Sequence, residues 1–154
     1  MMDKTLLISK IRDGTVIDHV KAGMSLKVLS ILNITGKEQL TVSVGMYVPS
    51  KRLGFKDVVK IEKRSLERPE LDRIALIAPD ASISIIRDYE VVEKFSVALE
   101  DRVVGIIKCS NLNCISNTRE PIKPEFFVRS RKPLALECIY CDREMFESEV
   151  LSSL

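Results

Sequence analysis

Two stretches near the C-terminal end, Cys109-Ser-Asn-Leu-Asn-Cys114 and Cys138-Ile-Tyr-Cys141, decide how this 154-residue sequence is organised. They hold all four cysteines of the chain, as two close pairs separated by 23 residues. Each pair can occupy one edge of a tetrahedron, so the pattern is typical of a four-cysteine zinc site. The sequence therefore predicts one structural Zn2+ bound by Cys109, Cys114, Cys138 and Cys141. Free thiols, two disulfides and an iron–sulfur centre are the alternatives.

Apolar, strand-like stretches precede both cysteine pairs, over Val103 to Lys108 and Leu134 to Glu137. Cysteine pairs that follow strands at turns are typical of zinc ribbons, so residues 101–154 are expected to form a small β-rich, zinc-ribbon-like domain. Because Cys fills all four ligand positions, no position remains for water, and the zinc is expected to be structural. In so small a module, metal binding would supply much of the free energy of folding.

The first hundred residues contain no cysteine and alternate between strand and helix periods. Apolar spacing and helix-start signals predict two helices, over residues 23–33 and from Pro69 to Ala78. Alternating or β-branched stretches predict strands over residues 15–20, 40–48, 55–62, 82–86 and 89–92, after a short apolar stretch at 6–11. This order fits an antiparallel sheet with two helices on one face, the ferredoxin-like plan. The predicted class is α+β, with domains at 1–100 and 101–154.

Composition excludes several classes of protein. Apolar residues make up 45% of the chain and charged residues 30%, which is a globular composition rather than a disordered one. The net charge of +2 does not favour nucleic-acid or membrane-surface binding through bulk charge. No apolar run approaches the ~18 residues of a membrane span, and the N-terminus does not predict a secretory signal. A cytoplasmic protein without a membrane partner is expected.

The sequence offers little for catalysis. His19 is the only histidine, and no nucleophile–histidine pair, glycine-rich phosphate loop or HExxH motif is present. In a regular strand, His19 and Asp18 would face opposite sides and form no dyad unless the backbone bends. Lys56 and Lys60 share one side of a strand, and with Lys94 they could form an anion site. A non-enzymatic chain is therefore predicted, with nucleotide binding as one possibility.

Together these motifs resemble the family of aspartate carbamoyltransferase regulatory chains, over about residues 5 to 151. Besides the two cysteine pairs, the matching segments are Gly14-Thr-Val-Ile-Asp-His19, Lys56-Asp57 with Lys60-Ile-Glu62, and Tyr89-Glu-Val-Val92 with Lys94. The resemblance implies a non-catalytic allosteric subunit in pyrimidine biosynthesis. Its ferredoxin-like domain would bind nucleotide effectors (CTP, ATP, UTP), and its zinc domain would contact the catalytic chain. Three regulatory homodimers and two catalytic trimers would form a dodecamer.

The resemblance also implies particular effector contacts. They are base contacts at Ile11 and Tyr89, ribose and base contacts at Asp18 and Lys60, phosphate contacts at His19, Val91 and Lys94, and pocket positions at Ile8, Val16, Lys56 and Ile86. Ser84 also belongs to this predicted site, at a position where the best-known bacterial members have Asn. Ser9 stands where those members have an acidic residue. Both departures lie near the base and bear on which nucleotide is preferred.

Two alternatives come from other classes. The first is a zinc-ribbon nucleic-acid-binding protein, for which the cluster of Arg129, Arg131 and Lys132 is the candidate surface. It predicts salt-dependent affinity for DNA or RNA. The second is a stand-alone sensor that would bind CTP without recruiting a catalytic chain.

Overall fold

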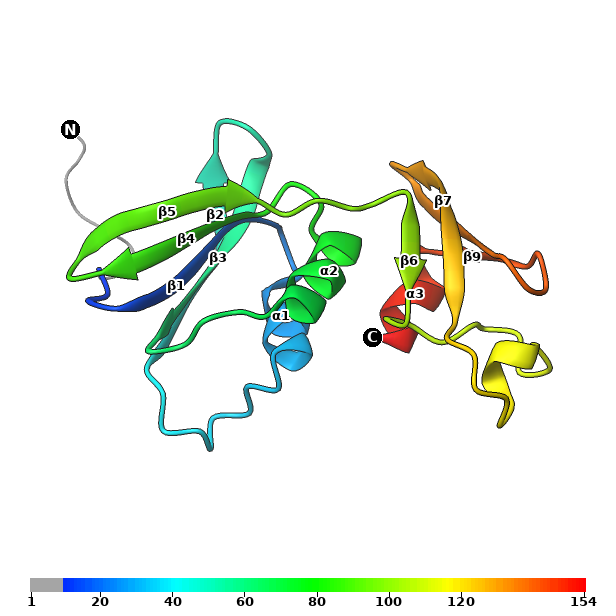
Figure 1. Cartoon of the computed structure of the whole chain (residues 1–154). Helices are drawn as coiled ribbons and strands as arrows, with labels where there is room; N and C mark the ends of the chain where they lie inside the picture. The colour runs from blue at the N-terminus through cyan, green and yellow to red at the C-terminus, as the bar shows by residue number, and fades with distance from the viewer. Residues whose placement is uncertain (1–9) are drawn as a thin grey trace. The chain divides into compact units, whose positions relative to one another are not determined.

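A computed structural model of the chain describes residues 10–154, which divide into two compact units between Ala98 and Leu99 (Figure 1). The first unit is an antiparallel sheet with two helices, and the second is a smaller sheet whose loops bring four cysteines together. The predicted α+β class is therefore confirmed. Most of the apolar stretch at 6–11 lies outside the described residues.

The first unit follows the predicted element order. Its elements are β1 (Gly14–Lys21), α1 (Ser25–Ile31), β2 (Val42–Ser50), β3 (Gly54–Glu62), α2 (Arg68–Ile77), β4 (Ser82–Arg87) and β5 (Glu90–Ser96). All neighbouring strands are antiparallel, and their order is β2-β3-β1-β4-β5. The ferredoxin-like plan accounts for β1 to β4, while β5 continues from β4 as a hairpin at the edge of the sheet.

The two faces of this sheet differ in character. Ile17, Val59 and Ile83 lie in register on adjacent strands and are almost fully buried, so they mark the face that the helices cover. Both helices lie on one side of the sheet (Figure 1). Helix α2 begins with a capping box, in which the Glu67 N–H donates to the Glu70 carboxylate. Period-two alternation then places Val16 and Lys60 on the opposite face, called the open face below.

The β5 strand is longer than predicted. It runs to Ser96, whereas the predicted strand ended at Val92 and the pattern from Phe95 to Glu100 was too weak to indicate one. Phe95 is part of the strand because it pairs with Ile83 on the helix side of the sheet. The other residues of β5 are exposed, so the strand shows no regular alternation of buried and exposed residues around Phe95.

The second unit contains four short strands and a terminal helix. They are β6 (Arg102–Val104), β7 (Glu125–Arg131), β8 (Leu134–Cys138), β9 (Glu144–Phe146) and α3 (Glu147–Ser153), with a 3-10 turn at Ile115–Asn117. The strands pair in the order β6-β7-β8-β9, and their core holds Phe126, Leu136 and Met145. Neither β7, β9 nor α3 was predicted.

The predicted strand from Val103 to Lys108 is wrong in its second half, because β6 ends at Val104. Gly105 follows with φ +70°, and its N–H donates to the Pro124 carbonyl at 2.8 Å. A residue in this conformation leaves the strand ladder. Ile107 is buried although it lies outside any strand, so the apolar run reflects core packing rather than strand pairing. Over residues 10–154, no helix is long and apolar enough to cross a membrane.

Candidate functional site

A polar row crosses the open face of the first unit. The register of the strands aligns Lys60 of β3 with Val16 of β1, Val16 with Ser84 of β4, and Ser84 with Lys94 of β5. These four residues come from four strands, and all four belong to the predicted nucleotide site. The sheet therefore brings together residues that lie up to 78 positions apart in the sequence.

A second group lies two residues further along β1, where Asp18 pairs with Ser82 of β4. The Lys56 Nζ atom lies 2.9 Å from the Asp18 Oδ1 atom, and both side chains are partly buried. Burial alone would raise the pKa of Asp18, but the hydrogen bonds from Lys56 and from the His19 backbone outweigh it and hold the pKa below its usual value. Asp18 is therefore an ionised acceptor at neutral pH.

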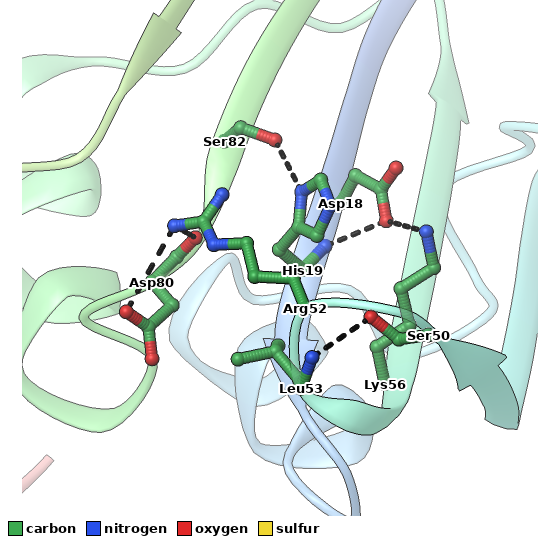
Figure 2. A network of polar contacts seen from close by, with 8 residues as sticks. All are labelled: Asp18, His19, Ser50, Arg52, Leu53, Lys56, Asp80 and Ser82. Atoms are coloured by element: carbon green, nitrogen blue, oxygen red, sulfur yellow. Dashed lines mark hydrogen bonds and ion pairs between the residues drawn. The ribbon is translucent and has the colours of Figure 1, made fainter.

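His19 sits in a bulge of β1 (Figure 2). The pairing of β1 with β3 shifts between Ile17 and Val20, and His19 has φ +56°. The backbone thus bends at this point, which the regular strand of the sequence prediction did not include. The His19 ring nevertheless forms no dyad with Asp18: its Nδ1 lies 3.0 Å from the Ser82 hydroxyl, and Asp18 Oδ1 instead accepts the His19 backbone N–H at 2.6 Å.

The lysines give this face a positive field. Burial lowers the pKa of Lys60, the Asp18 charge raises it, and the charge of Lys10 lowers it further, with a net lowering. The influence of Lys10 means that a second ammonium group lies near Lys60. Lys56, Lys60 and Lys94 lie on this face and Lys10 acts on it from nearby, so the face favours an anionic ligand.

The remaining predicted contacts lie toward the other end of the sheet. Ile86 aligns with Gly14 of β1 and with Val91 of β5. Tyr89 lies in the β4–β5 turn, and its backbone N–H donates to the Arg12 carbonyl at 2.9 Å, which places the turn beside the segment that contains the buried Ile11. The side chains of Val91 and Tyr89 are exposed. Ile8 lies outside the described residues.

Sequence reasoning missed two residues that order this region. One is Ser82, the partner of the His19 ring, which the alternation of Ser82, Ile83 and Ser84 could have placed on the same face as Ser84. The other is Asp57, which is fully buried and accepts backbone N–H groups of Gly23, Ser25 and Tyr47 at 2.9–3.1 Å. No local pattern indicates this role, because the three donors come from other segments.

The second unit contains a metal centre. The sulfur atoms of Cys109, Cys114, Cys138 and Cys141 all lie within 4.8 Å of one another, and none of these described cysteines forms a disulfide. Two of the Sγ–Sγ distances, Cys109 to Cys141 and Cys114 to Cys138, are 3.7 and 3.6 Å. With Zn–S bonds of ~2.3 Å, a tetrahedral site has sulfur atoms about 3.8 Å apart. The four thiols therefore fit one zinc ion.

The surroundings of the thiols also fit a structural site. Burial raises the pKa of the Cys109 thiol to about 12, so a cation that holds this residue as a thiolate must displace its proton. Asn117 braces the first cysteine loop, since its Nδ2 donates to the carbonyls of Cys109 at 2.9 Å and Asn111 at 2.7 Å. The Ser116 hydroxyl lies 3.2 Å from the Cys114 sulfur. These contacts orient the ligands.

The fold and the two sites define a class: a two-domain α+β protein that combines a ferredoxin-like domain, with a cationic sheet face, and a four-cysteine zinc domain.

Comparison with known proteins identifies the family within this class. Residues 6–98 match the model described as aspartate carbamoyltransferase regulatory chain, allosteric domain, and residues 101–151 match its metal binding domain. The chain is 60% identical to the aspartate carbamoyltransferase regulatory chain of Thermoplasma volcanium over 150 residues, which cover 97% of this chain and 99% of that one. Identity to the regulatory chain of Thermoplasma acidophilum is 54%, over 98% of this chain and all of that one. Identity to that of Methanothrix thermoacetophila is 52%, over 96% of each chain. The chain belongs to the family of aspartate carbamoyltransferase regulatory chains, and its cysteine cluster is the structural zinc site of the metal-binding domain.

Proposed function

We propose that the open face of the first unit binds a nucleoside triphosphate as an allosteric effector. The observation that carries this proposal is that Lys56, Lys60, Lys94 and the His19 ring share the open face with the ionised Asp18. The cations can pair with phosphates through charge-assisted hydrogen bonds, and the carboxylate can accept ribose hydroxyls. The apolar Ile86 and the turn at Tyr89 lie beyond Val16, where a base would contact Ile86 and the main chain.

The polar groups follow one another along β4. Ser82 is next to the His19 ring, Ser84 lies between Val16 and Lys94, and Ile86 is opposite Val91. A strand rises roughly 3.3 Å per residue, so Ile86 and Ser82 are separated by about 13 Å along the sheet. This length accommodates a base at one end and phosphates at the other. Ile8 is proposed as a further contact on the basis of the family resemblance alone.

The effector is proposed to act on a partner, an aspartate carbamoyltransferase catalytic chain, because the regulatory chain itself does no chemistry. The zinc domain of residues 101–154 is the proposed contact with that chain. A nucleotide changes activity only if it binds the two states of the assembly with different affinity. The complex is proposed to contain two catalytic trimers and three regulatory dimers.

The edge of the first sheet supports the regulatory homodimer. β2 is an edge strand, and its Met46 and Tyr47 side chains are exposed, with the Tyr47 ring stacked on Phe55 at 3.9 Å. An exposed apolar edge strand is a ready surface for pairing with another chain.

The nucleic-acid alternative has less support. In its candidate cluster, Arg129 pairs with Glu137 at 2.5 Å and Arg131 with Asp101 at 2.7 Å, so carboxylates already offset these charges. Strong, salt-dependent binding of DNA or RNA by the zinc-loaded chain would nevertheless revive it.

The test uses the zinc-loaded chain and its catalytic partner. Calorimetric titration with CTP, ATP and UTP is expected to give one saturable site per regulatory chain, and the nucleotide is expected to shift the aspartate dependence of the assembled enzyme. Removal of zinc is expected to prevent assembly, measured by light scattering, and to leave nucleotide binding in place. Normal assembly of the metal-free chain would contradict the role of the zinc domain, and no binding of any nucleotide would contradict the role of the open face.

A further inference from the structure

The hairpin between β2 and β3 places two adjacent cations, Lys51 and Arg52, at the end of the sheet where β1 bulges. The pairing of Ser50 with Gly54 closes this hairpin, and the Leu53 N–H donates to the Ser50 hydroxyl at 3.2 Å. Since β1 ends at Lys21 opposite Lys56, the hairpin lies just beyond the Asp18–Lys56 pair.

The Arg52 side chain extends from this hairpin toward the segment that leads into β4 (Figure 2). Its Nη2 atom lies 3.3 Å from the Asp80 carbonyl oxygen and 3.9 Å from the Asp80 Oδ1 atom. Two residues later in the same segment, Ser82 contacts the His19 ring. The Arg52 guanidinium therefore contacts the chain two residues before Ser82, the residue that the His19 ring contacts.

The contacts of Arg52 with Asp80 are loose. The carboxylate contact is at the limit of an ion pair, and 52% of the Arg52 side chain is exposed. Exposed pairs of this kind contribute little stability. A phosphate group carries more charge than a carboxylate and presents oxygens that a guanidinium can bind in a bidentate manner, so it can replace Asp80 as the partner of Arg52.

The cations form a series along the open face. Lys94 lies level with Ser84, the His19 ring lies at Ser82, and Arg52 lies at Asp80. The step from Ser84 to Ser82 spans two residues of β4, or roughly 7 Å. From Ser82 to Asp80 the chain leaves the strand and enters the turn at residues 79–80. A ligand with one phosphate can reach the first members of the series, and only a longer phosphate chain can reach its end.

We propose that Arg52 binds the terminal phosphate of the nucleotide and makes the site selective for triphosphates over monophosphates. This assignment rests on the proposed nucleotide site and adds to it a determinant of phosphate number. Asp80 holds Arg52 at the end of the site and competes with the phosphate for it.

The experiment compares CTP and CMP, and then ATP and AMP, by calorimetric titration of the full zinc-loaded chain. Arg52→Gln is expected to weaken triphosphate binding about tenfold, which is the effect expected from the loss of one charge-assisted hydrogen bond. Monophosphate binding is expected to be unchanged. Asp80→Asn is expected to strengthen triphosphate binding severalfold. Arg52→Lys keeps the charge but not the planar fork, so an intermediate loss is expected.

Arg68→Gln is the matched control. It removes the same charge from another exposed arginine, paired with Asp72 at 3.0 Å on α2, which packs on the opposite side of the sheet. The ratio of monophosphate to triphosphate dissociation constants is expected to be unchanged in this variant. An equal change for both ligands in Arg52→Gln, or no change, would overturn the assignment of Arg52 while leaving the nucleotide site intact. Failure of the unmodified chain to bind any of the four nucleotides would overturn both proposals.

Discussion

Asp18 uses a single oxygen, Oδ1, to bind both the Lys56 ammonium group and the His19 backbone N–H, at 2.9 and 2.6 Å. One carboxylate oxygen thus joins β1 to β3 at the bulge and fixes the conformation of His19. The other oxygen has neither of these two partners, and in the proposed function it is oriented to accept a ribose hydroxyl.

Asp18→Asn is expected to reduce discrimination between ribose and dideoxyribose. A carboxylate that accepts hydrogen bonds from two ribose hydroxyls contributes more binding free energy than a neutral amide in the same place. The affinity for CTP is therefore expected to fall about tenfold, and the affinity for dideoxy-CTP, which lacks these hydroxyls, is expected to change much less. Calorimetric titration measures both. Asp72→Asn on α2 is the control. Equal losses for the two nucleotides in Asp18→Asn would show that Asp18 does not contact the ribose.

Asp57→Asn is expected to destabilise the first unit in a pH-dependent way. Burial raises the pKa of Asp57, but the N–H groups of Tyr47, Ser25 and Gly23 outweigh it and lower the pKa below its usual value. A lowered pKa in the folded state stabilises the protein above about pH 4 and ceases to do so as the pH falls through the folded value. The variant is expected to lose about 1–3 kcal/mol at pH 7.

Urea unfolding at pH 7 and at pH 3 measures this effect. The difference in unfolding free energy between the unmodified chain and Asp57→Asn is expected to shrink at the lower pH, because Asp57 takes up a proton more readily in the unfolded chain than in the folded one. A difference that stays constant over this range would mean that the charge of Asp57 contributes nothing, and that only its shape matters.

Gly14→Ala is expected to destabilise the start of β1 strongly. Gly14 has φ +144°, and an added Cβ would lie 2.1 Å from the Ile61 carbonyl oxygen, a backbone atom of the paired strand. Gly36 also has positive φ, but its Cβ would meet nothing within 4 Å. Gly36→Ala is therefore expected to cost about 1 kcal/mol from conformation alone, and Gly14→Ala about 3 kcal/mol or more. Equal thermal shifts in the two variants would contradict the close approach.

Asn117→Ala is expected to weaken zinc retention without removing a ligand. The loss of two hydrogen bonds to the carbonyls of Cys109 and Asn111 frees the first cysteine loop, and such outer contacts typically change metal affinity 10- to 100-fold. The rate of zinc transfer to a chromogenic chelator measures the effect. Asn113→Ala, which keeps the backbone contact of residue 113 with Asn111, is the control. Unchanged zinc transfer in Asn117→Ala would assign these bonds to loop packing alone.

The features that repeat along the chain could be predicted from the sequence. Alternation predicted β4, and β-branched or apolar stretches between turn signals predicted β1 and β3, so the three central strands of the first sheet were found. The cysteine spacing predicted a cluster that could bind one metal ion. In each case the pattern lies within a few consecutive residues, because it arises from a strand that buries one side or from a tight turn between two metal ligands.

The features that depend on distant partners could not be predicted in this way. The bulge at His19 arises from the pairing of β1 with β3, and a single strand does not reveal a shift in its partner's register. Arg52 lies near His19 only because the hairpin and the segment before β4 meet at the same end of the sheet. In the second unit, β9 has only three residues, too short for a period to be recognised. Helix α3 buries only Val150, so its sequence carries no repeated apolar spacing.

The adjacent residues Lys56 and Asp57 lie on opposite faces of β3: Lys56 pairs with Asp18 on the open face, and Asp57 is buried on the side that the helices cover. Deleting or inserting a single residue in this strand would exchange the two roles and turn Lys60 inward and Val59 outward. Length variation among related chains is therefore expected to be excluded from Gly54–Glu62. The irregular segment between α1 and β2, where Gly36 meets no close neighbour, is the place in the first unit where added or lost residues would be tolerated.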